Sequence, residues 1–67
     1  MNYIEYKGKL INMDNIISIY PIQSVVTGGW TLIIDYGSDE EHIGFTAEGA
    51  TEVKTMFEEV KGMIQSL

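Results

Sequence analysis

The hydrophobic pattern is most regular in the last third of the chain. Apolar residues recur there at alternating spacings of three and four, which is the spacing of one face of an α-helix. Met56 and Met63 widen this apolar stripe, so that it can contact two neighbouring elements. The pattern predicts a helix over about residues 47–66, with Thr46 as its N-cap. The stripe consists of Ala50, Val53, Phe57, Val60, Ile64 and Leu67.

The preceding part of the chain alternates with the period of β-strands, most clearly over residues 30–36. Glycine-containing turns at residues 7–9, 27–30 and 37–39 separate the strand-like runs. Together with the terminal helix, this pattern predicts an α+β fold in one domain of residues 1–67. We expect an antiparallel sheet of four to five strands over about residues 2–46, followed by the C-terminal helix packed on that sheet.

Within the predicted sheet, the isoleucine-rich run from Ile16 to Tyr20 is expected to place Ile17 and Ile19 on the same face. Pro21 then interrupts the run, and a proline in a sheet marks either an edge position or a bulge. The bulge is favoured, because strand-like composition continues to Thr27.

The segment from Tyr6 to Ile19, YKGKLINMDNIISI, contains a strand, a glycine turn, a short second strand ending in Asn12 and an isoleucine-rich strand. This order, followed by a hairpin and a terminal helix, resembles very small bacterial and phage proteins, among them the flagellar FlbD-like proteins. The resemblance implies a fold more than a function, because one fold carries many activities.

Length and composition limit how such a fold is stabilised. A chain of 67 residues buries only about 60% of its unfolded surface, so small domains often need a disulfide, a metal or a partner subunit. The chain has no cysteine, and His42 is its single histidine, which argues against a structural zinc site. We therefore expect a homo-oligomer and no cofactor.

The charge is strongly acidic. Ten acidic residues against four lysines give a net charge of −6, and there is no arginine. Such a surface repels phosphates, so direct binding to nucleic acid is not expected. No run approaches the ~20 apolar residues of a membrane span, and the amino terminus lacks the apolar core of a signal peptide. A cytoplasmic location without membrane attachment is expected.

Catalytic chemistry has few candidates. His42 lies close in sequence to Asp39, Glu40 and Glu41, a combination that suits a metal site or an acid–base pair. An exposed strand residue is the favoured interpretation, because no second histidine or nucleophile accompanies it. We predict no catalytic, cofactor-binding or metal-binding residue, and no enzyme activity.

Protein binding has more candidates. Trp30 and the tyrosines form either an aromatic surface for a partner or part of the core; core packing is favoured for Trp30 and left open for the tyrosines. Met56 and Met63 suit either the edge of the core or a dimer seam. Val25 and Val26 form either an exposed apolar tip or a continued strand. The candidate interaction residues are Tyr3, Tyr20, Trp30, Tyr36, Met56 and Met63.

Three functions follow as hypotheses. The first is a non-enzymatic protein of bacterial or phage type that binds another protein through an aromatic or sheet surface or the helix. The second is a phage-encoded inhibitor of a host nucleic-acid enzyme or defence system, whose carboxylates imitate phosphates. The third is a small-ligand binder at an oligomer interface. The carboxylates of the second hypothesis are Asp39, Glu40, Glu41, Glu48, Glu52, Glu58 and Glu59.

Overall fold

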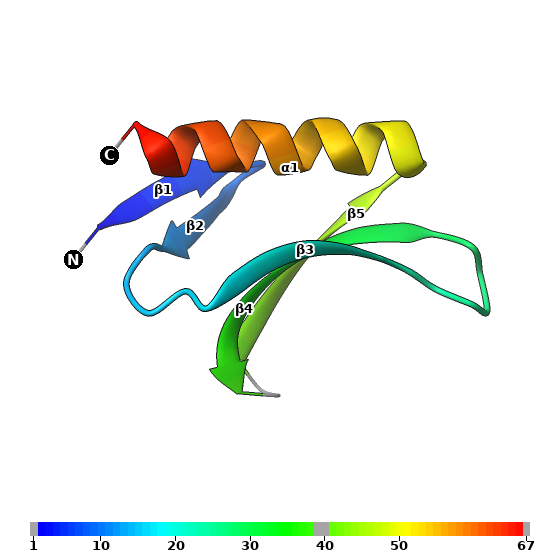
Figure 1. Cartoon of the computed structure of the whole chain (residues 1–67), viewed down its shortest axis with the longest axis horizontal. Coiled ribbons are helices and arrows are strands. Elements are labelled where there is room, and N and C mark those ends of the chain that lie inside the picture. Colours follow the sequence, from blue (N-terminus) through cyan, green and yellow to red (C-terminus); the bar gives the residue numbers. More distant parts are fainter. Residues whose placement is uncertain (1, 39–40, 67) are drawn as a thin grey trace.

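Five strands followed by one helix make up the computed structural model, which describes residues 2–38 and 41–66 (Figure 1). The α+β class and the C-terminal helix packed on strands are confirmed. The single sheet of four to five strands is wrong, because the strands form two separate antiparallel sheets, β1-β2 and β3-β4-β5. The elements are β1 (Tyr3–Tyr6), β2 (Lys9–Asn12), β3 (Ser18–Gln23), β4 (Trp30–Ser38), β5 (Glu41–Ala47) and α1 (Ala50–Gln65).

The sheets separate at the segment between β2 and β3. The backbone N–H of Asp14 donates to Asn12 Oδ1 at 2.9 Å, and Asn15 has a φ of 70°, in the left-handed region. These features turn the chain out of an extended conformation, so that β3 pairs with β4 instead of β2. The change in direction also places Ile17 before the strand, where 70% of its surface is exposed, instead of beside Ile19.

The first predicted turn is confirmed in detail. Lys7 and Gly8 have φ values of 48° and 80°, and Tyr6 pairs with Lys9 on either side of them. Positive φ at both central residues defines the type I′ turn, whose twist matches that of antiparallel strands.

Pro21 lies on an edge strand and not in a bulge. It pairs with Leu32 in a register that runs unbroken from Ser18–Asp35 to Gln23–Trp30. The irregularity in this sheet lies instead between Asp35 and Ser38, where β4 meets β5. The sequence allows either an edge position or a bulge for Pro21, and the structure places it at the edge of the sheet.

The helix begins later than expected. Thr46 remains in β5, paired with Thr31, and the N-cap of α1 is Gly49, in extended backbone and without a side-chain capping bond. Its carbonyl accepts the Val53 N–H at 3.0 Å. Because the β4-β5 ladder continues to Ala47, Thr46 cannot cap the helix.

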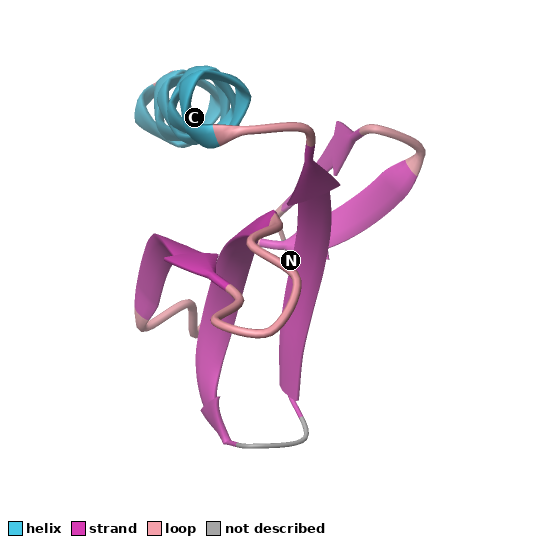
Figure 2. Ribbon diagram, turned by 90° about the vertical axis from the view of Figure 1, so that its right-hand side faces the viewer, coloured by secondary structure: helices cyan, strands magenta, loops and turns pink. Residues whose placement is uncertain are grey.

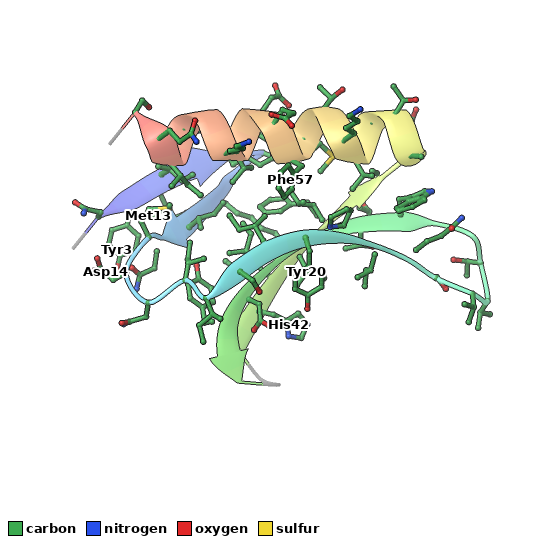
Figure 3. All side chains as sticks on the ribbon, viewed as in Figure 1. Tyr3, Met13, Asp14, Tyr20, His42 and Phe57 are labelled. Atoms are coloured by element: carbon green, nitrogen blue, oxygen red, sulfur yellow. The ribbon has the colours of Figure 1, made fainter. Side chains whose placement is uncertain are left out.

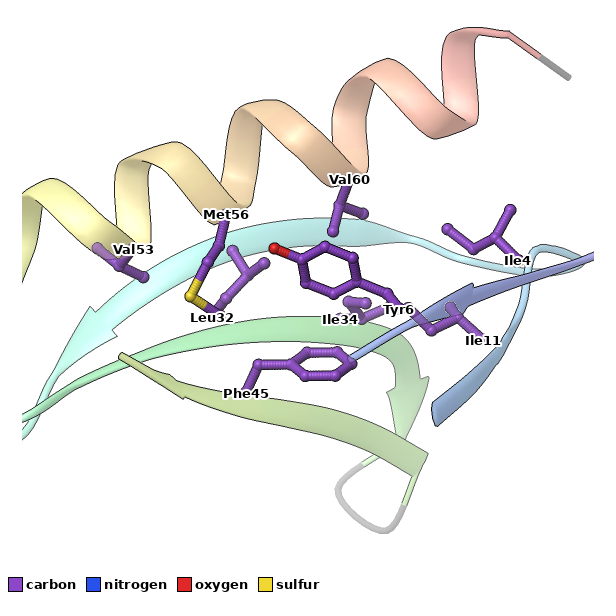
Figure 4. Packing of buried hydrophobic residues seen from close by; sticks show 9 residues of the cluster. All are labelled: Ile4, Tyr6, Ile11, Leu32, Ile34, Phe45, Val53, Met56 and Val60. Atoms are coloured by element: carbon purple, nitrogen blue, oxygen red, sulfur yellow. The ribbon is translucent and has the colours of Figure 1, made fainter. Parts of the chain in front are cut away.

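The core lies where α1 crosses β3, β4 and β5 and also contacts β1 (Figures 1 and 2). The rings of Tyr6 and Phe45 meet edge to face, with centroids 5.3 Å apart (Figure 4). On the helix, the buried positions are Val53, Met56 and Val60, whereas Phe57 and Ile64 are half-buried and Ala50 is exposed. The buried stripe is therefore rotated around the helix relative to the predicted one. The buried cluster comprises Ile4, Tyr6, Ile11, Leu32, Ile34, Phe45, Val53, Met56 and Val60.

Candidate functional site

The aromatic candidates do not form one surface. Tyr20, on β3, is 39% exposed, and Trp30, at the start of β4, is half-buried against the core. Tyr3 and Tyr36 line a pocket in a different part of the molecule. The expected aromatic surface is therefore divided between two regions.

The two candidate methionines differ in burial. Met56 is 1% exposed and belongs to the core, whereas Met63 is half-buried at the edge of the core. The side chain of Met56 therefore packs inside the core and cannot contact a partner. Of the two methionines, only Met63 remains near the surface.

The tip of the β3-β4 hairpin presents two valines to solvent. Val25 and Val26 have relative exposures of 101% and 89%, although β-branched apolar side chains are usually buried. The tip projects past the first turn of α1 (Figure 1). Neither valine contributes to the core, so their exposure needs another explanation.

The backbone of this tip is held by a dense set of hydrogen bonds. Ser24 Oγ accepts the backbone N–H groups of Val26 and Thr27, both at 3.2 Å. The Gly28 N–H donates to the Ser24 carbonyl at 2.9 Å, and the Gln23 Nε2 amide donates to the Gly28 carbonyl at 3.2 Å. The loop is thus organised in advance, which reduces the entropy that binding would cost.

Further apolar side chains continue from the tip along β3. Ile22 is 44% exposed and lies on the same face as Tyr20, because the two residues are separated by one position in the strand. Ile19 and Pro21, which alternate with them, lie on the face nearer α1. Val25, Val26, Tyr20 and Ile22 together form what we call the hairpin surface. Of these four residues the sequence marked only Tyr20 as an interaction residue, because a bulge at Pro21 would have broken the alternation that places Ile22 on the same face.

A second feature is a groove between α1 and β3, which has two parts with volumes of about 400 and 170 Å³. Phe57 lines both parts and lies between the helix and β3 in Figure 3. We call this feature the α1–β3 groove. Its apolar lining includes Ile19, Pro21, Trp30, Ala50, Phe57 and Ile64, and its charged lining consists of Lys54, Glu58 and Lys61.

The third feature is a pocket of about 440 Å³ with mixed polar and apolar lining, which we call the polar pocket. Tyr36 is fixed in its wall, since its hydroxyl donates to the Asn12 carbonyl at 2.7 Å, and burial raises the pKa of Tyr36. His42 also lines this pocket. Within residues 2–38 and 41–66, no three His, Asp or Glu side chains are grouped so as to hold a metal ion. The lining is Tyr3, Leu10, Asn12, Asp14, Asn15, Tyr36, His42 and Ile43.

The acidic residues of the helix do not share one environment. Glu59 accepts a hydrogen bond from the Tyr6 hydroxyl, whereas Glu58 lines the α1–β3 groove. Burial, and then the hydrogen bond and charge of Glu59 and the charge of Glu52, raise the pKa of Tyr6 to about 12. Asp39, Glu40 and the side chain of Glu41 lie outside the part of the chain that the structure describes.

Comparison with protein families, with curated proteins and with solved structures finds no match to this chain. No helix in the described residues is both long and apolar enough to cross a membrane.

Proposed function

We propose that this protein is a small non-enzymatic interaction protein that binds another protein through the hairpin surface. The observation that carries the proposal is the exposure of Val25 and Val26, 101% and 89%, on a loop held by its own hydrogen bonds. A partner that covers both valines gains roughly 25 cal/mol for each Å² of apolar surface removed from water. Little of this gain is lost to ordering the loop.

Tyr20 and Ile22 support the same proposal, because they extend the apolar surface from the tip onto the rigid strand. An apolar strand face next to a projecting loop suits a partner with a shallow apolar cleft. Tyrosine is also common among the residues that contribute most to binding, since it has a large contact area and few rotatable bonds.

The test is a comparative capture experiment from lysate of the cells that produce the protein. Wild type, the double variant Val25→Ser/Val26→Ser and the control Leu10→Ser are immobilised, and captured proteins are quantified by mass spectrometry. Leu10 is a suitable control because it is 68% exposed and lies on β2, outside the hairpin surface. We expect a protein that wild type and Leu10→Ser retain and the double variant loses. Equal capture by all three chains would refute the proposal.

The polar pocket favours a second candidate function, the binding of a small polar molecule. Its volume of about 440 Å³ lies within the range of ligand sites, and tyrosine, asparagine and aspartate side chains line it. A thermal-shift screen of nucleotides and metabolites tests this candidate, because a ligand that binds the folded state raises the unfolding temperature. The expected shift disappears in Asn12→Ala, and a screen without any shift would remove this candidate.

A further inference from the structure

The α1–β3 groove is lined by two positively charged side chains, although the protein as a whole is acidic. Lys54 and Lys61 lie on its helical flank, in a chain whose net charge is −6. The other two lysines are directed to aromatic rings elsewhere, with Lys7 Nζ 5.7 Å from the Tyr6 ring centroid and Lys9 Nζ 5.3 Å from that of Phe45. Within the described residues, neither Lys54 nor Lys61 forms an ion pair. Glu58 lies between them, so the flank has a small net positive charge.

An extended strand is a poor occupant of this groove, because Pro21 interrupts the edge of β3. The Ser24 N–H donates to the Gly29 carbonyl at 2.9 Å, which makes positions 24 and 29 a hydrogen-bonded pair in the β3-β4 register. Such pairs recur at every second residue, so Ile22 and Tyr20 also bond to β4. Pro21 then presents its nitrogen to the outside, where an added strand would need an N–H donor.

A helix needs no backbone donor from β3. It can lie beside α1, where apolar side chains fill the groove around Phe57 and polar side chains reach the lysines. Lys54 and Lys61 are seven residues apart in the sequence, hence about 10 Å apart along the helix axis. Two carboxylates seven residues apart on a neighbouring helix match this separation.

We propose that the α1–β3 groove binds an amphipathic helix of a partner protein, with an apolar stripe toward Phe57 and two acidic residues, seven positions apart, toward Lys54 and Lys61. The inference rests on the protein-binding role proposed above and assigns a second contact region to the partner. The groove begins at Trp30, directly after the hairpin tip, so one partner can reach both the groove and the tip valines, whereas Tyr20 and Ile22 lie on the face of β3 directed away from α1.

A second copy of the chain fits the groove less well. The apolar stripe of α1 in the second copy is buried in that copy's own core, since Val53, Met56 and Val60 are 2%, 1% and 0% exposed. It is therefore not free to enter the groove. If two copies met groove to groove, the four lysines would outnumber the two Glu58 carboxylates in one seam, where the excess positive charge is unfavourable.

The probe that tests this proposal is a displayed library of 16-residue peptides, selected on the immobilised full chain. We expect enriched peptides to have apolar residues at spacings of three and four and acidic residues seven positions apart. Trp30 is the single tryptophan and lines the groove, so binding of an enriched peptide should change its fluorescence. Affinity should fall at least tenfold in Lys54→Glu/Lys61→Glu and by less than twofold in the charge-matched control Lys7→Glu/Lys9→Glu.

Other results overturn the proposal. They are enrichment of peptides that alternate with period two, absence of enrichment, and binding that leaves Trp30 fluorescence unchanged. A doubling of mass in sedimentation that Phe57→Asp abolishes would instead identify a second copy as the occupant. The hairpin variant Val25→Ser/Val26→Ser should still bind the peptides, so failure at the groove and failure at the hairpin surface are separable.

Discussion

The hydroxyl of Tyr6 donates a hydrogen bond to Glu59 Oε1 at 2.9 Å and so links β1 to α1 across a sequence separation of 53. We expect Tyr6→Phe to lower the free energy of unfolding by about 1 kcal/mol, because the bond is lost while the ring stays packed on Phe45. Urea unfolding measures the change. Tyr20→Phe is the matched control, since Tyr20 is exposed and its hydroxyl forms no hydrogen bond within the described residues. Equal stability of wild type and Tyr6→Phe would contradict the prediction.

The raised pKa of the Tyr6 hydroxyl predicts that the protein becomes less stable at alkaline pH. Its pKa is raised from 10.0 to about 12, chiefly by burial and then by the hydrogen bond to Glu59. The unfolded chain therefore releases this proton at a lower pH than the folded chain. The stabilisation is complete below pH 10 and is lost as the pH rises from 10 to about 12. Urea midpoints across this range should fall less steeply in Tyr6→Phe than in wild type, and parallel curves would refute the assignment.

Met56 is predicted to contribute to the free energy of unfolding and not to the binding of a partner. It is 1% exposed on the face of α1 that packs on the strands, so Met56→Ala leaves a cavity and should cost about 2–4 kcal/mol. Met63→Ala is the matched control, because Met63 is half-buried and its neighbours can partly fill the space. Urea unfolding of both variants is the measurement. A smaller loss in Met56→Ala than in Met63→Ala would show that the buried stripe of α1 is placed wrongly.

Pro21 is predicted to protect the edge of β3 from pairing with other chains. Pro21→Thr restores an outward N–H between Ile19 and Gln23, which completes a row of edge groups. We expect this variant to self-associate more strongly than wild type in a concentration series of sedimentation velocity. Ile22→Thr is the control, since it adds a threonine to the same strand but its N–H is directed to β4. An unchanged mass for Pro21→Thr at every concentration would contradict the prediction.

The position of the hairpin tip, one part of the candidate site, could be predicted from the sequence. The sequence predicted a glycine-containing turn at residues 27–30 and left Val25 and Val26, just before it, as either a tip or a continued strand. Their exposure depends on where the β3-β4 register ends, at the Gln23–Trp30 pair. The groove could not be predicted, because it lies between two elements that are distant in the chain.

The sequence by itself determined the α+β class, the order of the elements and the first turn, because these depend on periodicity and on local backbone preference. The tertiary structure decided the rest. Division into two sheets depends on the turn at Asp14 and Asn15, and the burial of Met56 depends on which face of α1 packs against the strands. The apolar pattern allows several neighbouring helix faces, and only packing against a particular sheet selects one of them. That selection buries Val53, Met56 and Val60 and leaves Phe57 half-buried in the α1–β3 groove.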